Sequence, residues 1–429
     1  MNILVIGSGG REHALVWAMS KSGHRKPKLF CAPGNAGIAQ VAACVAIDAT
    51  DVSGLARFAE EKGIDLTVVG GEAPLAAGIV DEFEGRGLAV AGASRAAAQL
   101  ESSKAFAKDF MARHSIPTAR YAVANSAAEA RAILLSGEFG AETSAVVVKA
   151  DGLAAGKGVV VARSRAEALS AVEDLMERGS VGRDAARRIV IEEALEGREA
   201  SLLLFTDGRD YALMPAARDH KRVGENDTGP NTGGMGAITA PTVLDEATLA
   251  RAVREIVEPT LEGARSEGFP FRGVLFVGLM LTAEGPRVLE YNVRFGDPEA
   301  QAILVRLRTD LVDVFEAVAR GRLIDVPVEW TNESSACVVL AARGYPARPE
   351  TGATIRGLER ADEMANVQVF HAGTSRSPEG VWRTAGGRVL GVTATAQTLE
   401  RALHRCYDAV SEISWDGMHY RRDIGRFTE

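Results

Sequence analysis

Short apolar runs alternate with amphipathic segments over the first hundred residues. Continuous apolar runs are typical of buried strands, and apolar positions three or four residues apart are typical of helices. The strand-like runs are residues 3–6, 66–69 and 88–91, and the helix-like segments are residues 11–21, 52–62 and 76–84. This alternation predicts a doubly wound parallel sheet with helices on both faces. Ligands bind such sheets at the carboxyl ends of the strands, where the loops that begin at Gly7, Pro33 and Gly70 share one rim.

A second pattern follows a helix predicted over residues 102–114 and a stop at Pro117. Its elements are a helix over 127–135, a strand over 145–149, a glycine-rich loop, a strand over 158–162, a helix over 165–177 and a strand over 188–193. They predict a small α+β lobe inserted as a lid. From residue 199 to 292, strands surround one long helix over 245–267, which predicts a larger α+β lobe closed by a helix over 310–320.

Beyond Gly321 the pattern changes to short alternating strands and one helix. The strands are expected over 335–342, 367–371, 382–384 and 388–393, and the helix over 398–411. We interpret this region as a separate, small mixed α/β domain. The predicted protein is therefore multidomain, α/β and α+β: a doubly wound N-terminal domain over 1–102, a two-lobed core over 103–325 with its lid at about 118–194, and a C-terminal domain over 326–429.

Composition narrows the class of protein. The 429-residue chain is 46% hydrophobic and 25% charged, and its formal net charge of -8 argues against a nucleic-acid-binding surface. No apolar run approaches the ~18–20 residues of a membrane span, and no secretory signal follows Met1. We expect a cytoplasmic protein without nucleic-acid or membrane partners. Its four cysteines lack metal-ligand spacing and are expected to be small buried hydrophobic residues.

Residues 289–299 form the segment with the clearest chemistry, an apolar strand that ends in a charged turn. Glu290 and Asn292 lie two positions apart on it. Residues two apart on a strand face the same side, so their oxygen atoms can converge on one hard cation, as when Mg²⁺ bridges the phosphates of a nucleotide. The alternative is that both side chains form the solvent-exposed face of an edge strand.

Two glycine-rich segments have features of ligand-binding loops. Residues 149–159 place glycines between Lys149 and Val159, as a phosphate-cradling hairpin requires, although the spacing is not that of a P-loop. The alternative is a flexible surface hairpin. Residues 219–236 contain five glycines and charges of both signs. A long structureless loop is usually functional, so we expect substrate capture there, with disorder as the alternative.

Two further segments are weaker signals. Residues 194–198 link two predicted strands, and such a linker offers backbone groups to an adenine edge while Glu199 accepts ribose hydroxyls. Residues 7–13 resemble the start of a dinucleotide fingerprint, but Glu12 replaces its third glycine. The helix that follows can still offer free N–H groups to a phosphate. The histidines are dispersed, so acyl-enzyme chemistry is not expected.

Taken in order, these segments resemble the ATP-grasp superfamily and, within it, the phosphoribosylamine–glycine ligase family. The segments that carry the resemblance are residues 7–14, 33–37, 149–159, 219–222, 231–236, 290–299 and 420–425. The resemblance spans the whole chain and implies that the two-lobed core is an ATP-grasp core. In one respect the chain departs from many ATP-grasp enzymes, because residues 275–281 contain no third acidic metal ligand.

The resemblance implies a two-step ligation in de novo purine synthesis. The carboxylate of glycine attacks the γ-phosphate of ATP to give glycyl phosphate, and the amine of 5-phosphoribosylamine then displaces phosphate. Phosphorylation supplies the leaving group that a carboxylate lacks, while cations neutralise the transferring phosphoryl group. The expected cofactor is Mg²⁺ or Mn²⁺, the substrates are ATP, glycine and 5-phosphoribosylamine, and the expected assembly is a monomer or homodimer.

The resemblance also implies roles for individual residues. Asp219 would pair with the ammonium of glycine, and Arg294 with its carboxylate or the acyl phosphate, for which a planar guanidinium is suited. With Lys149 they form the expected catalytic set. The nucleotide would contact Lys104, Lys149, Gly156, Glu192, Glu193, Leu195 and Glu199, and the metal Glu290 and Asn292. The other substrates would contact Gly9, Asn35, Glu72, Asp219, Arg294 and Asp297.

Two other classes of function stay open at this point. A nucleotide-dependent oxidoreductase is suggested by the doubly wound start with Gly7 and Gly9, and it predicts NAD(P) binding without nucleotide hydrolysis. An ATP-binding regulatory module predicts MgATP binding without glycine-dependent release of ADP.

Overall fold

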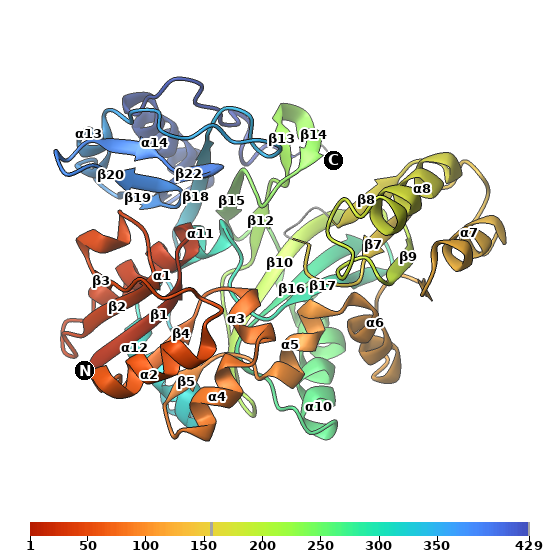
Figure 1. Ribbon diagram of the computed structural model, residues 1–429, viewed down its shortest axis with the longest axis horizontal. Helices are drawn as coiled ribbons and strands as arrows, with labels where there is room; N and C mark the ends of the chain where they lie inside the picture. The colour runs from red at the N-terminus through yellow and green to blue at the C-terminus, as the bar shows by residue number, and fades with distance from the viewer. Residues whose placement is uncertain (155–157, 428–429) are drawn as a thin grey trace.

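The computed structural model describes residues 1–154 and 158–427. Figure 1 shows a central sheet with the N-terminal part on one side, the lid projecting from the other, and the C-terminal part above the N-terminal part. Among the described residues, no helix combines the length and apolar character needed to cross a membrane.

The N-terminal part is a five-stranded parallel sheet in the order β3-β2-β1-β4-β5. Its strands are β1 (Asn2–Gly7), β2 (Lys28–Pro33), β3 (Ala43–Cys44), β4 (Leu66–Val69) and β5 (Val90–Ala91). Its helices are α1 (Gly10–Ser20), the short turn η1 (Ile38–Gln40), α2 (Val52–Lys62), α3 (Glu72–Ala76), α4 (Ile79–Gly85) and α5 (Arg95–Ser102). The doubly wound prediction is confirmed.

The lid is a four-stranded antiparallel sheet in the order β6-β9-β7-β8, reached through α6 (Lys104–Arg113). Its strands are β6 (Tyr121–Ala124), β7 (Val146–Ala150), β8 (Val159–Ala162) and β9 (Ile189–Glu193). Its helices are α7 (Ala127–Leu135) and α8 (Arg165–Val172), which continues into the π-helical turn η2 (Glu173–Glu177). Strands β7 and β8, which flank the glycine-rich segment, pair antiparallel, as the predicted hairpin requires.

The central sheet has nine strands in the order β17-β16-β10-β12-β15-β18-β22-β19, with β11 paired to β10. Its core strands are β10 (Arg198–Asp207), β11 (Tyr211–Leu213), β12 (Ala217–Asp219), β15 (Gly236–Thr239), β16 (Arg272–Thr282) and β17 (Gly285–Asn292). The long helix predicted over 245–267 is one run of α9 (Glu246–Ala252), η4 (Val253–Val257) and α10 (Glu258–Ser266). Helices α11 (Glu299–Leu304) and α12 (Leu311–Arg320) and the turn η5 (Leu323–Asp325) follow.

Alternate residues of β10 pack into two different cores, as the period of a strand requires. Leu202 and Leu204 share a core with Leu4 and Ile6 of β1, and Leu203 and Phe205 share another with Ile3 and Val5. The N-terminal sheet and the central sheet are therefore joined by buried apolar contacts. This packing fixes the N-terminal rim relative to the end of β17.

The C-terminal strands β18 (Ser334–Ala341), β22 (Arg388–Ala396) and β19 (Val367–His371) extend the central sheet through the pairing of β15 with β18. The sequence did not predict this continuity, because strand partners far apart in the chain leave no local pattern. The remaining elements are α13 (Leu358–Asp362), the hairpin β20 (Thr374–Arg376) and β21 (Trp382–Thr384), and α14 (Leu399–Glu412). The boundary at residue 326 stays a prediction.

Three local expectations were wrong. Cys44 is exposed, whereas all four cysteines were expected to be buried. Residues 219–236 are not a structureless loop, since they contain the hairpin β13 (Arg222–Gly224) and β14 (Thr228–Asn231), joined by the turn η3 (Glu225–Asp227). The single helix expected over 76–84 is two helices, α3 and α4, separated at Gly78, whose φ of 86° lies in the left-handed region. Glycine adopts that conformation without the steric cost of a Cβ atom.

Candidate active site

The end of β17 carries the predicted metal ligands. Tyr291 is buried on one face of the strand, where its hydroxyl lies 2.7 Å from that of Thr260, so Glu290 and Asn292 share the other face. The strand lies at the edge of the central sheet, but its polar face is not solvated, because Asn292 is only 8% exposed. The solvent-exposed alternative is therefore wrong for Asn292.

Glu290 is a carboxylate among cations. Burial raises its pKa, but Lys221, Lys104, Lys149 and Arg294 together lower it below the usual value. None of the described residues hydrogen-bonds its side chain. An ionised carboxylate and an amide oxygen are ligands that a hard divalent cation prefers, so this donor set fits the metal that the resemblance implies.

Arg294 is held by a network of acidic and carbonyl oxygens. Its Nε donates to Glu72 at 3.1 Å, its Nη2 donates to Glu101 at 2.6 Å and to Asn292 Oδ1 at 3.0 Å, and its Nη1 donates to the Phe295 carbonyl at 3.1 Å. Four of its five N–H groups are thus used. The guanidinium plane is fixed between the N-terminal part and β17, and one Nη1 N–H has no acceptor among residues 1–154 and 158–427.

Glu101 of α5 is a partner that the sequence analysis missed. It accepts the Val293 N–H at 2.8 Å in addition to its ion pair with Arg294. Burial raises the pKa of Glu101, and the charge of Arg294 opposes this effect. Glu101 lies in an ordinary helical sequence, so no local pattern predicted that it belongs to the site.

The root of the lid contains a buried cluster of alternating charge. Glu192 is ion-paired at 2.8 Å with Lys149 through Oε1 and at 2.8 Å with Lys108 through Oε2. Lys149 also donates to the Leu289 carbonyl at 3.1 Å, which links the lid to β17. Burial, opposed by Glu192, lowers the pKa of Lys108 to about 8. Lys108 was not among the predicted site residues. Glu192 was predicted to contact the nucleotide, whereas in the structure its carboxylate pairs with two lysines.

Lys104 is the first residue of α6, whose start is fastened to the lid. Asp151, directly after β7, accepts the Ala105 N–H at 2.8 Å and the Ser103 hydroxyl at 2.9 Å, and its carbonyl accepts the Lys104 N–H at 3.0 Å. These bonds fix the position from which the Lys104 side chain extends at the start of α6. The predicted nucleotide contact Gly156 lies outside the described residues.

The linker between β9 and β10 keeps its backbone free. Glu193 turns to the lid surface, where Arg120 pairs with it at 2.8 Å, and Leu195 is half-buried. In the part of the chain that the structure describes, no acceptor takes the N–H groups of residues 194–197. Glu199 accepts from Lys221 Nζ at 2.6 Å.

Asp219 ends β12 next to these groups. Burial raises its pKa, Lys221 lowers it, and the negative charges of Glu199 and Glu290 raise it further. The same carboxylates raise the pKa of Lys221 despite its burial. Lys221 therefore connects the predicted ribose residue with the predicted glycine and metal residues, a role that the sequence analysis did not assign.

The N-terminal rim, formed by the loops that begin at Gly7, Pro33 and Gly70, lies beside Arg294 and Asp297. The Gly9 N–H donates to Glu12 at 2.6 Å, whereas the N–H groups of Gly10 and Arg11 donate to no residue within 1–154 or 158–427. Asn35 donates to the Ser8 and His371 carbonyls at 2.7 and 3.0 Å and caps the η1 turn. Its side chain is fully used in shaping the rim, so only its loop is available to a substrate.

Asp297 joins the rim to the C-terminal part. It accepts from Gln301 at 2.7 Å and from Arg388 of β22 at 2.9 Å, and Arg388 also donates to the Gly233 carbonyl at 2.6 Å. A Cβ atom on Gly9 would lie 3.5 Å from Asp297 Oδ2. Arg388 was missed because it stands alone in a strand far along the chain.

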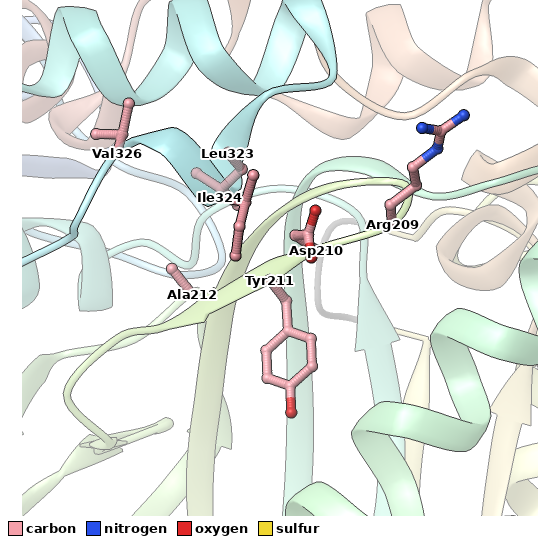
Figure 2. Close-up of a pocket in the computed structure, with 7 residues that line it drawn as sticks. All are labelled: Arg209, Asp210, Tyr211, Ala212, Leu323, Ile324 and Val326. Atoms are coloured by element: carbon pink, nitrogen blue, oxygen red, sulfur yellow. The ribbon is translucent and has the colours of Figure 1, made fainter.

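Figure 2 shows a different pocket of about 250 Å³, between the β10–β11 turn and the turn η5. It is lined by Arg209, Asp210, Tyr211, Ala212, Leu323, Ile324 and Val326. In the view, the ring of Tyr211 points away from Leu323 and Ile324. No predicted site residue lines this pocket, so it is not the candidate active site.

Three family models match the chain in order. The phosphoribosylglycinamide synthetase N domain matches residues 1–101, its ATP-grasp (A) domain matches residues 102–300, and its C domain matches residues 335–427. The chain belongs to the phosphoribosylglycinamide synthetase family. The family and the ATP-grasp fold predicted from the motifs are confirmed.

Individual members of this family are similar over the full length. The phosphoribosylamine–glycine ligases of Brucella melitensis biotype 1 and Caulobacter vibrioides are each 49% identical to the chain, with 99% of it covered and 97% and 98% of the relative. The crystal structure of phosphoribosylamine–glycine ligase from Thermotoga maritima has a TM-score of 0.84 at 33% identity, covering 99% of this chain and 100% of that one. These family members are ligases, so the oxidoreductase alternative gains no support.

Proposed function

We propose that this protein is an ATP-dependent ligase that joins glycine to 5-phosphoribosylamine in de novo purine synthesis. Glycyl phosphate is the intermediate, and glycinamide ribonucleotide, ADP and phosphate are the products. One observation carries the proposal. In a member of this family, oxygen ligands for a metal, a guanidinium fixed by hydrogen bonds and several lysines lie together at the end of β17.

The nucleotide would lie between the lid and β17. Lys104 and Lys149 would contact its phosphates, the free backbone N–H groups of residues 194–197 would face adenine, and Glu199 would accept ribose hydroxyls. Glu192 would act on the nucleotide through Lys149, because both of its oxygens are ion-paired. Glu290 and Asn292 would hold Mg²⁺ or Mn²⁺, which neutralises charge on the transferring phosphoryl group when bound.

Glycine would bind between Asp219 and Arg294. Asp219 would accept N–H bonds from the ammonium, and Arg294 would offer its remaining Nη1 N–H to the carboxylate. Glu72 and Glu101 support this geometry because they hold the guanidinium plane at 3.1 and 2.6 Å. The carboxylate is then positioned for in-line attack on the γ-phosphate. Because the Arg294 side chain is already ordered, glycine binding does not have to order it.

The sugar phosphate would bind at the N-terminal rim, formed by the loops of Gly9, Asn35 and Glu72 and by Asp297. The unused N–H groups of Gly10 and Arg11 begin the eleven-residue helix α1. Free N–H groups at a helix start attract phosphate through hydrogen bonding and the helix dipole. The amine would then be directed towards the acyl phosphate near Arg294.

A coupled assay of ADP release tests the function. Glycine and enzymatically generated 5-phosphoribosylamine together should cause ADP release, which chelation of divalent cations should abolish and added Mg²⁺ or Mn²⁺ should restore. No ADP above the control without glycine would overturn the ligase proposal and favour a regulatory ATP-binding module. Light scattering of the same preparation would distinguish a monomer from a homodimer.

A further inference from the structure

Lys108 is a buried lysine of α6 for which the proposed function has no role. Its side chain is only 2% exposed, and its Nζ lies 2.8 Å from Glu192 Oε2 and donates to the Thr118 hydroxyl at 2.8 Å. A buried ammonium is tolerated only when it is paired and hydrogen-bonded in this way. An apolar residue of similar volume often stabilises a core as well as a buried ion pair does. Stability alone therefore does not explain the lysine.

Lys108 joins the two chain crossings between the lid and the core. Thr118 lies where the chain enters the lid, and its hydroxyl donates to the Val288 carbonyl of β17 at 2.6 Å. Glu192 lies near the end of β9, where the chain leaves the lid. The ring centre of Tyr121, on β6, lies 5.9 Å from Lys108 Nζ. The ammonium of Lys108 is thus fixed relative to β17 and to both crossings.

The other oxygen of Glu192 holds Lys149, the predicted phosphate contact. Glu192 Oε1 lies 2.8 Å from Lys149 Nζ, which also donates to the Leu289 carbonyl at 3.1 Å. An ammonium has three N–H donors, so within the described residues Lys149 keeps one donor for a phosphate oxygen. Glu192 therefore divides its two oxygens between a lysine that would contact the nucleotide and a second lysine, Lys108, that is enclosed by protein.

The charge on Lys108 sets the net charge of this cluster. With both lysines protonated and Glu192 ionised, one positive charge remains in excess. Without the charge on Lys108, Glu192 would cancel the charge of Lys149, and both of its oxygens could turn to that lysine. They would then compete with a phosphate for the donors of Lys149. Such a change acts strongly on a bound polyanion, because the dielectric of a buried site is low.

We propose that Lys108 is a positioning residue for ATP, which occupies one oxygen of Glu192 and so leaves Lys149 its positive charge and a donor for the phosphates. This inference rests on the proposed function, because the nucleotide there lies between the lid and β17. It adds a residue that touches no substrate and acts through Glu192 on a residue that does.

The test is calorimetric titration of the protein with the Mg²⁺ complex of a non-hydrolysable ATP analogue and, separately, with adenosine. Lys108→Met keeps an unbranched side chain and removes its charge. We expect the dissociation constant of the analogue to rise about tenfold or more, and that of adenosine, which has no phosphate, to change less than about twofold. Arg113→Met removes an exposed cation from the same helix and should change neither constant.

A double variant separates positioning from a merely structural role. Lys108→Met combined with Glu192→Gln also removes the carboxylate that would cancel the charge of Lys149, so the analogue should bind more tightly than to Lys108→Met alone. The double variant also leaves no buried carboxylate short of a partner, which favours folding. Weaker binding of the analogue by the double variant than by Lys108→Met would overturn the inference.

The unaltered protein gives a further test through pH. Burial lowers the pKa of Lys108 to about 8, and the charge of Lys149 acts in the same direction, while Glu192 and Glu193 oppose both. Tyr121, which also faces Lys108, has its pKa raised to about 12, chiefly by burial. As pH rises from about 7 to about 9.5, the dissociation constant of the analogue should rise while that of adenosine stays constant, because Lys108 loses its proton.

Three other results would also contradict the role of Lys108. They are an analogue affinity that does not change over this pH range, an unchanged analogue affinity in Lys108→Met, and equal weakening of the analogue and adenosine in that variant. Failure of the unaltered protein to release ADP with glycine would instead overturn the proposed function, and the binding measurements do not depend on that turnover.

Discussion

At the scale of the residue, Glu290 combines burial with a charge that its surroundings favour. Its pKa is low because four cations outweigh the effect of burial. We predict that Glu290→Ala lowers kcat by about 100- to 1,000-fold, because a metal oxygen ligand and the partner of these cations are both lost. The circular dichroism spectrum should be unchanged.

A matched control for Glu290→Ala lies in the same hairpin. Glu284 lies in the exposed turn between β16 and β17, where it accepts a hydrogen bond from the Thr282 hydroxyl at 2.9 Å. Glu284→Ala should leave kcat within about twofold, as exposed substitutions usually have small effects. Unchanged, metal-dependent activity in Glu290→Ala would show that the metal is held elsewhere.

Arg294 depends on the shape of its guanidinium as well as its charge. A lysine cannot replace the four hydrogen bonds of Arg294 and still offer an N–H to the substrate, because an ammonium has three donors on one atom and lacks the planar fork. We predict that Arg294→Lys reduces kcat/KM for glycine by about 100-fold or more. Arg25→Lys, at an exposed arginine that also has two acidic partners, should have no effect. A mild loss in Arg294→Lys would mean that Arg294 has only a structural role.

At the scale of the element, the C-terminal segment clasps the hairpin β13–β14. Arg421 is fully buried and pairs at 2.7 Å with both Asp227 of the hairpin and Asp423. The Gly425 N–H donates to His220 at 2.9 Å, and Phe427 stacks on the same ring. His220 lies between Asp219 and Lys221 in the sequence. These contacts of the C-terminal segment therefore help to position two residues of the candidate active site.

We predict that Arg421→Met loosens the hairpin and weakens glycine binding. Removing the buried guanidinium deprives Asp423, whose side chain is only 13% exposed, of its ion pair, and breaks the link between Asp227 of the hairpin and the C-terminal segment. Hydrogen exchange of residues 222–231 should accelerate by at least about tenfold, and KM for glycine should rise. Arg422→Met, at the exposed neighbouring residue, is the control. Equal exchange in both variants would contradict a clasping role for Arg421.

Elements with a strong local pattern were predicted closely, and those that depend on distant partners were not. The predicted ranges 52–62, 66–69 and 127–135 coincide with α2, β4 and α7. Strand β2 was missed, and the pairing of β15 with β18 has no signature in either segment. For the candidate site, the ordered motifs predicted Glu290, Asn292 and Arg294, which the structure brings together at the end of β17. Lys108, Glu101 and Arg388 were not predicted, because each is an isolated charge in the sequence and its ion-pair partner lies far away along the chain.

At the scale of the whole molecule, two neutral histidines lie between the N-terminal and C-terminal parts. His13 of α1 accepts the His371 N–H at 2.8 Å, and both side chains are buried. Burial, together with the charge of His371, lowers the pKa of His13 to about 3, and burial lowers that of His371 to about 4. An unfolded histidine titrates near ~6.5. The unfolded chain therefore binds more protons between pH 6.5 and 4, and stability falls as pH falls through this window.

We predict that lowering the pH from 7 to 5 reduces the free energy of unfolding by about 2 kcal/mol for each of these histidines. Thermal midpoints across this range should show a smaller decrease in His371→Gln, because glutamine does not titrate. His404→Gln, at an exposed histidine of α14, should follow the unaltered protein. A pH profile of His371→Gln identical to that of the unaltered protein would contradict the assignment.

The central claim is that the cleft activates the carboxylate of glycine by phosphorylation. The most direct measurement uses glycine labelled with ¹⁸O in its carboxylate, together with ATP and 5-phosphoribosylamine, followed by mass analysis of the phosphate released. The account predicts one ¹⁸O atom in each phosphate, because the carboxylate oxygen that attacks the γ-phosphate leaves with it when the amide forms. Unlabelled phosphate from a reaction that consumes glycine would contradict the account.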